Sequence, residues 1–419
     1  MLSSTRTVCE RRESAGVLSA LRSGSFVTLP RLRVYGTLLL AAYAATFLAL
    51  LATADGIVDA AGRPLGADFA SVYAAGKLAL AGEAERAYDW SHHHAMQKDV
   101  AARPQIGYFP WAYPPTFLGV AAGLAVLPYL AAFCIYQVLA ACVYLAAMLR
   151  IAGRREAWLP ALAFPAAFVS AAHGNDGLLS AGLLGGVLFC VRQRPLLAGV
   201  LLGCLSYKLE FWPIIPVVLG LAGYWRAVAA TALTALAFAG FAGAAFGGEA
   251  FAAFWASLPL THQVAFEGAR GFHKIPSVHG ALRLLGAPFA VATVAQSAVT
   301  AATLAALAAL WRSAAAFELK AAGLIVGCLL ATPYALDYDL VVLAPAIAFL
   351  AAYGMREGFR DWEVAALAAL WVLPLAGRSI ASAAGIQLAP IVLACVLYLV
   401  LARAGVLPIR ARVGRRREA

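Results

Sequence analysis

One carboxylate in a polar stretch after the first apolar run is the group best placed to do chemistry. Asp68 lies in Gly66-Ala67-Asp68-Phe69, and the polar stretch ends in an aromatic and proline-rich run at 108–115. A carboxylate within hydrogen-bond reach can accept the proton of an attacking hydroxyl group. The apolar segment 114–128 is too short to span a membrane and fits a surface-lying or re-entrant helix. Together these features suit chemistry on a substrate with a lipid tail.

The composition is that of an integral membrane protein. The chain has 419 residues, of which 63% are hydrophobic and 13% charged, with a mean hydropathy of +0.80. The net charge of +11 could suggest nucleic acid, but the basic residues cluster at the chain ends and in short breaks between apolar runs. We therefore expect the lipid bilayer as a partner and no nucleic acid. The seven cysteines lie mostly in apolar runs without a CxxC pair, which favours packing roles.

The apolar runs predict an all-α membrane bundle, because a spanning helix needs about 20 apolar residues. A long first extracytoplasmic loop, about 55–128, is expected to carry short surface or re-entrant helices. The domain boundaries are a basic N-terminal segment at 1–32, a membrane domain at 33–404 and a basic tail at 405–419. About twelve spans are expected, near 33–54, 129–150, 157–173, 178–191, 196–208, 211–225, 227–247, 287–310, 318–333, 339–354, 363–381 and 386–404.

The basic residues predict the orientation of the chain. Twelve spans place both termini on one side, and most of the 32 lysines and arginines then fall on that side. By the positive-inside rule it is the cytoplasmic side. We expect a multi-pass protein of a bacterial inner membrane with both termini in the cytoplasm. Ala52-Thr53-Ala54 also resembles a signal-peptide cleavage site, but the long apolar run and the long segment before it favour an uncleaved anchor.

The unusual polar residues gather on the outer side in this topology, and ionisable groups at membrane depth by default mark a functional site. Asn175 is the only asparagine of the chain. The cytoplasmic breaks carry little beyond charge and aromatic anchors, so the working face is expected outside. Beside Asp68, the candidate site residues are Tyr73, Tyr113, His173, Asn175, Asp176, Lys208, Lys274, His279, Asp337, Asp339 and Arg378.

Lys208 has two interpretations, and the sequence leaves both open. It is one of five lysines in a chain rich in arginine. A compact ammonium group suits a single phosphate oxygen, whereas arginine prefers a bidentate fork. Lys208 could equally be a helix-end lysine that pairs with Glu210. Lys274, Arg378 and Arg270 are further cations that could neutralise a phosphate leaving group.

Two motifs suggest metal binding, and in each the alternative is favoured. Asp337-Tyr338-Asp339 has the DxD form, but two acids at a helix end need further ligands to hold a cation. His92-His93-His94 could bind a transition metal, yet three adjacent histidines on a helix cannot all face one ion, which favours a solvated segment. No cofactor is therefore expected, with a divalent metal as the alternative. Gly199 and Gly203 are typical of close helix packing.

Four segments in this order resemble glycosyltransferase family 87, over roughly residues 33–350. They are Asp68-Phe69 with Tyr73 and Gly76, Tyr113-Pro114-Pro115, the Lys208 segment after a Gly-rich span, and Thr332-Pro333 with Tyr338-Asp339-Leu340 and Pro345. The resemblance implies a GT-C-type bundle and a hexosyltransferase, in particular a mannosyltransferase. It also implies a polyprenyl-phosphate sugar donor, a glycolipid or glycan acceptor, inverting transfer on the outer face, and Asp68 as the base. Some members carry a His pair where Tyr338-Asp339 stands here.

Two other classes of function compete with this interpretation. A polytopic transporter or lipid-linked-sugar flippase could also have about twelve spans, but its charges tend to lie in mid-span and its first loop is short. Here residues 55–128 form a long polar loop, and the ionisable residues lie at outer span ends. A non-catalytic scaffold would leave the grouping of Asp68, Asp176, Lys208 and Asp339 unexplained. These features favour the glycosyltransferase.

Overall fold

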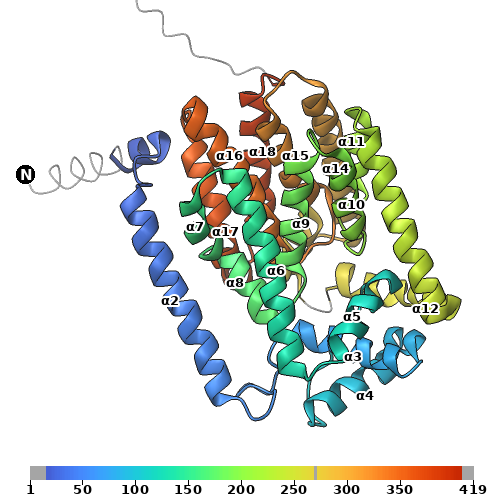
Figure 1. Ribbon diagram of the computed structural model, residues 1–419. Coiled ribbons are helices and arrows are strands. Elements are labelled where there is room, and N and C mark those ends of the chain that lie inside the picture. Colours follow the sequence, from blue (N-terminus) through green and yellow to red (C-terminus); the bar gives the residue numbers. More distant parts are fainter. Residues whose placement is uncertain (1–15, 269–270, 408–419) are drawn as a thin grey trace, which may run out of the picture.

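The computed structural model describes residues 16–268 and 271–407, and every extended regular element in these ranges is a helix (Figure 1). Six of the described helices are long and apolar enough to cross a membrane, which confirms the prediction of an all-α membrane protein. They are α2 (Leu29–Thr53), α6 (Tyr129–Ala152), α12 (Trp225–Phe266), α14 (Phe289–Arg312), η5 continued by α16 (Asp337–Val342 and Leu343–Glu357), and α17 (Glu363–Ala384).

Shorter apolar helices fill the rest of the bundle. They are α9 (Gly177–Cys190), α10 (Pro195–Cys204), α11 (Ile214–Leu221), α15 (Phe317–Ala331) and α18 (Ala389–Arg403). Most of their bounds lie within a few residues of the predicted spans. A helix of 8 to 15 residues is only about 12–22 Å long, less than the bilayer core of about 30 Å. The count of twelve full spans therefore stays a prediction.

Among the predicted spans that differ from the structure, three do so at a glycine, a proline or a turn. The span 157–173 is broken at Pro165 into η3 (Arg155–Ala157), α7 (Trp158–Leu162) and α8 (Pro165–His173). The span 196–208 ends early, because α10 stops at Cys204 and turns lead to Lys208. The span 227–247 is too short, because α12 continues to Phe266 past a kink at Gly247, where φ is 77°. Glycine adopts this left-handed backbone at little steric expense.

Short helices form the segment between α2 and α6; that this segment is an extracytoplasmic loop stays a prediction. They are α3 (Ala67–Leu80), η1 (Ala84–Tyr88), α4 (Trp90–Ala101), η2 (Pro115–Phe117) and α5 (Leu118–Ala125). They gather at one end of the bundle (Figure 1). Gly76 of α3 lies directly on the backbone of Ala121 in α5, where a Cβ atom would clash. This close approach explains a glycine in the middle of a buried helix.

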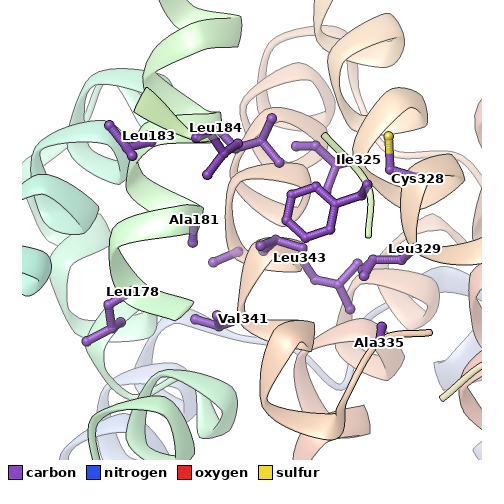
Figure 2. Close-up of a cluster of buried hydrophobic side chains, with 14 of the residues drawn as sticks. Leu178, Ala181, Leu183, Leu184, Ile325, Cys328, Leu329, Ala335, Val341 and Leu343 are labelled. Atoms are coloured by element: carbon purple, nitrogen blue, oxygen red, sulfur yellow. The ribbon is translucent and has the colours of Figure 1, made fainter. Parts of the chain in front are cut away.

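The core of the bundle lies where α9, α15 and α16 meet (Figure 2). Leu184 of α9, Ile325 of α15 and Leu343 of α16 are each at most 1% exposed. On its other side α9 packs against α6, where a Cβ on Gly182 would lie 2.6 Å from the backbone nitrogen of Tyr144. This packing fixes the axis of α9, and with it the residues at both of its ends.

The outer surface of the bundle is apolar. Leu233 and Leu236 of α12 are 71% and 69% exposed, and α2 is almost entirely exposed along its length. Exposed leucines in such number are expected against lipid rather than water. Gly199 of α10 packs on α12, with its Cβ position 2.5 Å from the Cβ of Ala230, which confirms the close packing predicted there.

Candidate active site

A buried lysine stands at the centre of the candidate site and faces three carboxylates. The Nζ atom of Lys208 lies 2.8 Å from Oδ1 of Asp339, 3.2 Å from Oδ2 of Asp176 and 3.4 Å from Oε1 of Glu210. The side chains of Lys208, Asp176 and Asp339 are at most 5% exposed. We call these four residues the ionic cluster. Its members are far apart in the chain, since Lys208 and Asp339 are separated by 131 positions.

Three short connections bring the cluster together. Asp176 precedes the first residue of α9, directly after the tight α8–α9 turn at Gly174, where φ is 71°. Lys208 and Glu210 lie in the turns between α10 and α11. Asp339 lies in η5, where its Oδ2 accepts a hydrogen bond of 2.8 Å from the backbone nitrogen of Leu336. Because α8 and α9 both pack against η5, the connections meet at one point.

Neutral hydroxyl groups complete the surroundings of Asp176. Tyr113 donates a hydrogen bond of 2.6 Å to its Oδ1, and Ser180 donates one of 2.6 Å to its Oδ2. Tyr113 belongs to the segment before η2, so the first loop reaches the cluster here. Burial raises the pKa of Tyr113 well above its usual range, which keeps the hydroxyl protonated as a donor.

The charges of the cluster do not cancel if all three acids are ionised. One ammonium group then faces three carboxylates in a buried place, where an uncompensated charge is unfavourable. Burial raises the pKa of Glu210 to about 7, against the opposing effect of Lys208. Asp176 and Asp339 are the two nearer partners of Lys208, and we treat them as its counter-ions.

These contacts bear directly on the two interpretations of Lys208. An ammonium group has three N–H donors, and three carboxylates surround this one. The pairing with Glu210 expected from sequence is present, together with two stronger pairings that the sequence did not indicate. A phosphate contact would have to displace one of these carboxylates. These contacts favour a positioning role for Lys208.

Asp68 lies in the first turn of α3, which packs on the same α8–α9 turn. Gly174 has no room for a side chain, since its Cβ position is 2.7 Å from Cβ of Phe69 and 3.2 Å from Cα of Gly66. Asp68 is half-buried. The first turn of a helix favours a negative charge, because its backbone N–H groups point toward it. The start of α3 and the segment at Tyr113 thus place the first loop against the turn that carries Asp176.

A second ion pair lies beside the cluster and separates the two acids of the DxD motif. Asp337 pairs with Arg378 of α17 at 3.2 Å, whereas Asp339 faces Lys208. The two carboxylates therefore pair with different cations. The described ranges contain no group of three or more His, Cys, Asp or Glu residues that could hold a metal ion.

Further cations come from η4 (Phe272–Lys274), which packs against α17. Gln387 donates hydrogen bonds to the backbone oxygens of His273 and Ile275, at 3.3 and 3.2 Å, and so holds this segment. Burial lowers the pKa of His273, and the neighbouring Lys274 and Arg378 add to that effect. Lys274 and Arg378 thus share one neighbourhood. Arg270 lies outside the described residues.

His173 and Asn175 stabilise the α8–α9 turn. The Nδ1 atom of His173 lies 2.9 Å from the backbone oxygen of Val169, and its ring packs 6.0 Å from that of Tyr338. The Oδ1 atom of Asn175 accepts hydrogen bonds from Ser170 at 2.6 Å and from the backbone of Gly177 at 2.9 Å. These contacts hold the end of α8 and the start of α9 in place. Contact with a sugar stays a prediction.

Two candidates make their contacts away from the ionic cluster. Tyr73 donates a hydrogen bond of 2.8 Å to the backbone oxygen of Leu127 and packs against Tyr129, so it joins α3 to the start of α6. His279 of α13 (Val278–Leu284) is buried with its ring against Phe266 and Phe289. The structure assigns both residues packing contacts and does not bring them to Lys208.

The three adjacent histidines, His92, His93 and His94, each contact a different partner. His92 faces Asp89, His93 lies 3.0 Å from the backbone oxygen of Ser71, and His94 lies 2.9 Å from that of Ile106. The rings therefore do not converge on one ion. His93 is fully buried, which differs from the solvated segment expected from sequence. It joins α4 to α3, the helix that carries Asp68.

Sequence reasoning missed two hydroxyl groups of the site, Ser180 and Tyr207. Ser180 bonds Asp176, and the hydroxyl group of Tyr207 lies 3.0 Å from that of Ser180. A signal for Ser180 was present, because it follows Asp176 by four positions and so lies on the same face of a helix. Tyr207 precedes Lys208 directly, but residue type alone gave no reason to select it.

Fold and site together define a multi-span helical membrane protein with a buried ionic site at one end of its bundle. Among known families, glycosyltransferase family 87 matches residues 111–333, more than half of the chain. The chain therefore belongs to glycosyltransferase family 87 and is a membrane glycosyltransferase, as its sequence motifs predicted. It matches no curated protein and no solved structure. The matched range includes Tyr113, Asp176 and Lys208, and Asp68 lies before it.

Proposed function

We propose that this glycosyltransferase moves a hexose, in particular mannose, from a polyprenyl-phosphate donor to a glycolipid or glycan acceptor. The reaction takes place on the outer face of a bacterial inner membrane. The observation that carries the proposal is the contact between the first turn of α3, with Asp68, and the α8–α9 turn that carries Asp176. It places the helix turn that carries Asp68 against the turn that leads to Asp176 of the ionic cluster, within a family whose members transfer sugars.

In this proposal Asp68 is the general base of a single inverting displacement. A hydroxyl oxygen of the acceptor attacks the anomeric carbon, and a new C–O bond forms as the bond to the phosphate oxygen breaks. The proton of that hydroxyl passes to the carboxylate of Asp68. Polyprenyl phosphate leaves with the electron pair of the broken bond. No cofactor takes part.

The cations divide into two roles. Lys274 and Arg378 neutralise the phosphate of the donor, because the structure places both in one neighbourhood near Asp337. Lys208 acts through its partners. By pairing with Asp176 and Asp339, it holds η5 and the start of α9 together, next to the helix turn that carries Asp68.

The lipid tail of the donor lies along the segment 114–128. Val120 of α5 and Val126 just after it are 43% and 70% exposed, so this segment offers an apolar surface beside the start of the first loop. A polyprenyl chain in contact with it would leave the sugar phosphate near Tyr113, which precedes the segment and bonds Asp176.

The sidedness of the proposal rests on the basic residues. Arg192, Lys320 and Arg356 lie together at the end of the bundle away from the ionic cluster. The positive-inside rule makes that end cytoplasmic and the cluster extracytoplasmic. Cysteines introduced at positions 68 and 155 provide the check: an impermeant thiol reagent added outside intact cells should label the first and not the second. The reverse pattern would contradict the orientation.

The catalytic role is tested with Asp68→Asn and, as a matched control, Asp99→Asn. Asp99 is an exposed acid of α4 in the same loop. Membranes are supplied with polyprenyl-phosphate-linked radiolabelled mannose, and label in glycolipid or glycan is counted. Loss of a general base is expected to slow transfer by about 10²- to 10⁴-fold. The control should transfer at the wild-type rate.

Unfolding midpoints of both variants show whether the fold is intact. Transfer by a folded Asp68→Asn variant at more than about a tenth of the wild-type rate would remove Asp68 from the role of base. If the wild type transfers glucose or galactose from the corresponding donors and not mannose, the sugar assignment is wrong and the assignment of the base stands.

A further inference from the structure

A basic cavity lies at the opposite end of the bundle from the ionic cluster. It has a volume of about 480 Å³ and is lined by the ends of several helices. Arg192 follows α9, whose other end carries Asp176, and Arg356 lies in the last turn of α16, which continues η5 with Asp339. The cavity is therefore separated from the candidate site by the length of these helices.

The lining of the cavity has an excess of positive charge. It contains Arg192, Lys320 and Arg356, and a single acid, Glu318. Glu318 forms an ion pair with Arg356, which also pairs with Glu357. Arg192 and Lys320 form no ion pair with any residue in the described ranges. Two cations thus remain available to an anion.

Each of these cations is held in place. The guanidinium group of Arg192 lies over the ring of Phe317, at 5.5 Å from its centre. The Nζ atom of Lys320 donates to the backbone oxygens of Trp311 and Ser313, at 3.1 and 2.7 Å. Lys320 thereby covers the carbonyl groups at the end of α14, which would otherwise disfavour an anion.

The first turn of α15 adds a second source of positive potential. Ala316, Phe317 and Glu318 line the cavity, and α15 begins at Phe317. The N–H groups at a helix start favour anions, above all phosphates. A volume of about 480 Å³ is within the range of ligand sites, about 300–1,000 Å³, and exceeds what a lone phosphate ion fills.

We propose that this cavity binds a phosphate group carried on a larger molecule, through Arg192, Lys320 and the first turn of α15. Arginine suits phosphate because its planar group can donate two parallel hydrogen bonds, and lysine adds a point charge. The phosphate belongs either to the head group of an anionic lipid at the membrane surface or to a free phosphorylated molecule. The site is separate from the proposed sugar transfer and does not depend on it.

The test compares Arg192→Gln with Arg155→Gln. Both arginines are exposed and lie at the same end of the bundle, but Arg155 does not line the cavity. The full-length protein is placed in nanodiscs of phosphatidylcholine with and without phosphatidic acid, and native mass spectrometry counts the phosphatidic acid that stays bound. In detergent, pyrophosphate is titrated while thermal unfolding is followed.

The wild type is expected to retain phosphatidic acid over phosphatidylcholine, or to be stabilised by pyrophosphate. Arg192→Gln should weaken that binding about fivefold, the effect of one basic residue near a charged lipid surface, and Arg155→Gln should leave it unchanged. Retention of the lipid identifies a head group, and stabilisation by pyrophosphate alone identifies a free phosphate. Absence of both, or equal loss in the two variants, would overturn the proposal.

Discussion

Replacement of Lys208 by methionine isolates the charge at the centre of the ionic cluster. Methionine has nearly the length of lysine, so the change removes the ammonium group and leaves the volume filled. Asp176 and Asp339 then lose a cation at 3.2 and 2.8 Å while their side chains stay buried. Removal of one partner from a buried ion pair destabilises a fold by about 3–5 kcal/mol.

A second route gives a similar magnitude. A buried carboxylate that has lost its cation can become neutral by binding a proton. For an acid with an ordinary pKa of about 4, pH 7 lies about 3 units above the pKa, so protonation costs about 4 kcal/mol. We therefore expect Lys208→Met to lower the free energy of unfolding by about 4 kcal/mol at pH 7. SDS titration of the purified protein in mixed micelles, followed by tryptophan fluorescence, measures the loss.

The loss of stability in Lys208→Met should depend on pH, and its direction follows from the proton that the buried carboxylate binds. If the folded variant takes up a proton that the unfolded chain does not hold, its stability falls as pH rises through the neutral range. The deficit relative to the wild type should shrink to less than about 2 kcal/mol at pH 5. Adding Asp339→Asn to Lys208→Met should recover part of the stability, because one stranded charge is removed.

Lys98→Met is the matched control, since Lys98 is a half-buried lysine of α4 in the first loop. It should change the free energy of unfolding by less than about 0.5 kcal/mol. A Lys208→Met protein within about 1 kcal/mol of the wild type, or a deficit equal at pH 5 and pH 8, would show that Lys208 is not the counter-ion of buried carboxylates.

Two further predictions concern the first loop. Tyr113→Phe removes the donor of a 2.6 Å hydrogen bond to Asp176 and should lower the free energy of unfolding by about 1.5–3 kcal/mol in the SDS titration. The control is Tyr398→Phe, whose ring is exposed, and it should lower that free energy by no more than about 0.5 kcal/mol. Burial lowers the pKa of His93 to about 4. Between about pH 6.5 and 4 the imidazole of His93 is protonated in the unfolded chain but not in the folded protein. The free energy of unfolding should therefore fall by up to about 3 kcal/mol as pH drops through that window. His93→Gln should abolish this component, and an unchanged pH profile in that variant would contradict it.

The positions of most helices could be predicted from hydropathy. The expected span 129–150 corresponds to α6, which ends at Ala152, and the expected span 178–191 corresponds to α9 within one residue at each end. Long apolar runs leave little choice, because a backbone without water must satisfy its own hydrogen bonds within a helix. The deviations occur where glycine or proline acts in a way that composition does not specify. Pro165 broke one predicted span, whereas Gly247 kinked α12 without ending it.

The sequence predicted that three members of the ionic cluster lie on one side of the membrane, but not how they pair. Sidedness selected Asp176, Lys208 and Asp339, because each follows or begins an apolar run on the expected outer side. The sequence could not indicate that the three side chains face one another, nor that Tyr113 reaches Asp176 across 63 positions. It also could not show that Tyr73 and His279 would be used in packing, because a polar aromatic residue looks the same in either role.

The sequence by itself determined that this chain is a helical membrane glycosyltransferase and roughly where its helices lie, since local apolarity and motif order fix both. Only the tertiary structure decided that Lys208 balances buried carboxylates and that Asp337 and Asp339 serve different cations. The physical reason is that electrostatic interactions in a buried place depend on separations of a few ångströms. Those separations are set by how α8, α9 and η5 pack, which no single segment contains.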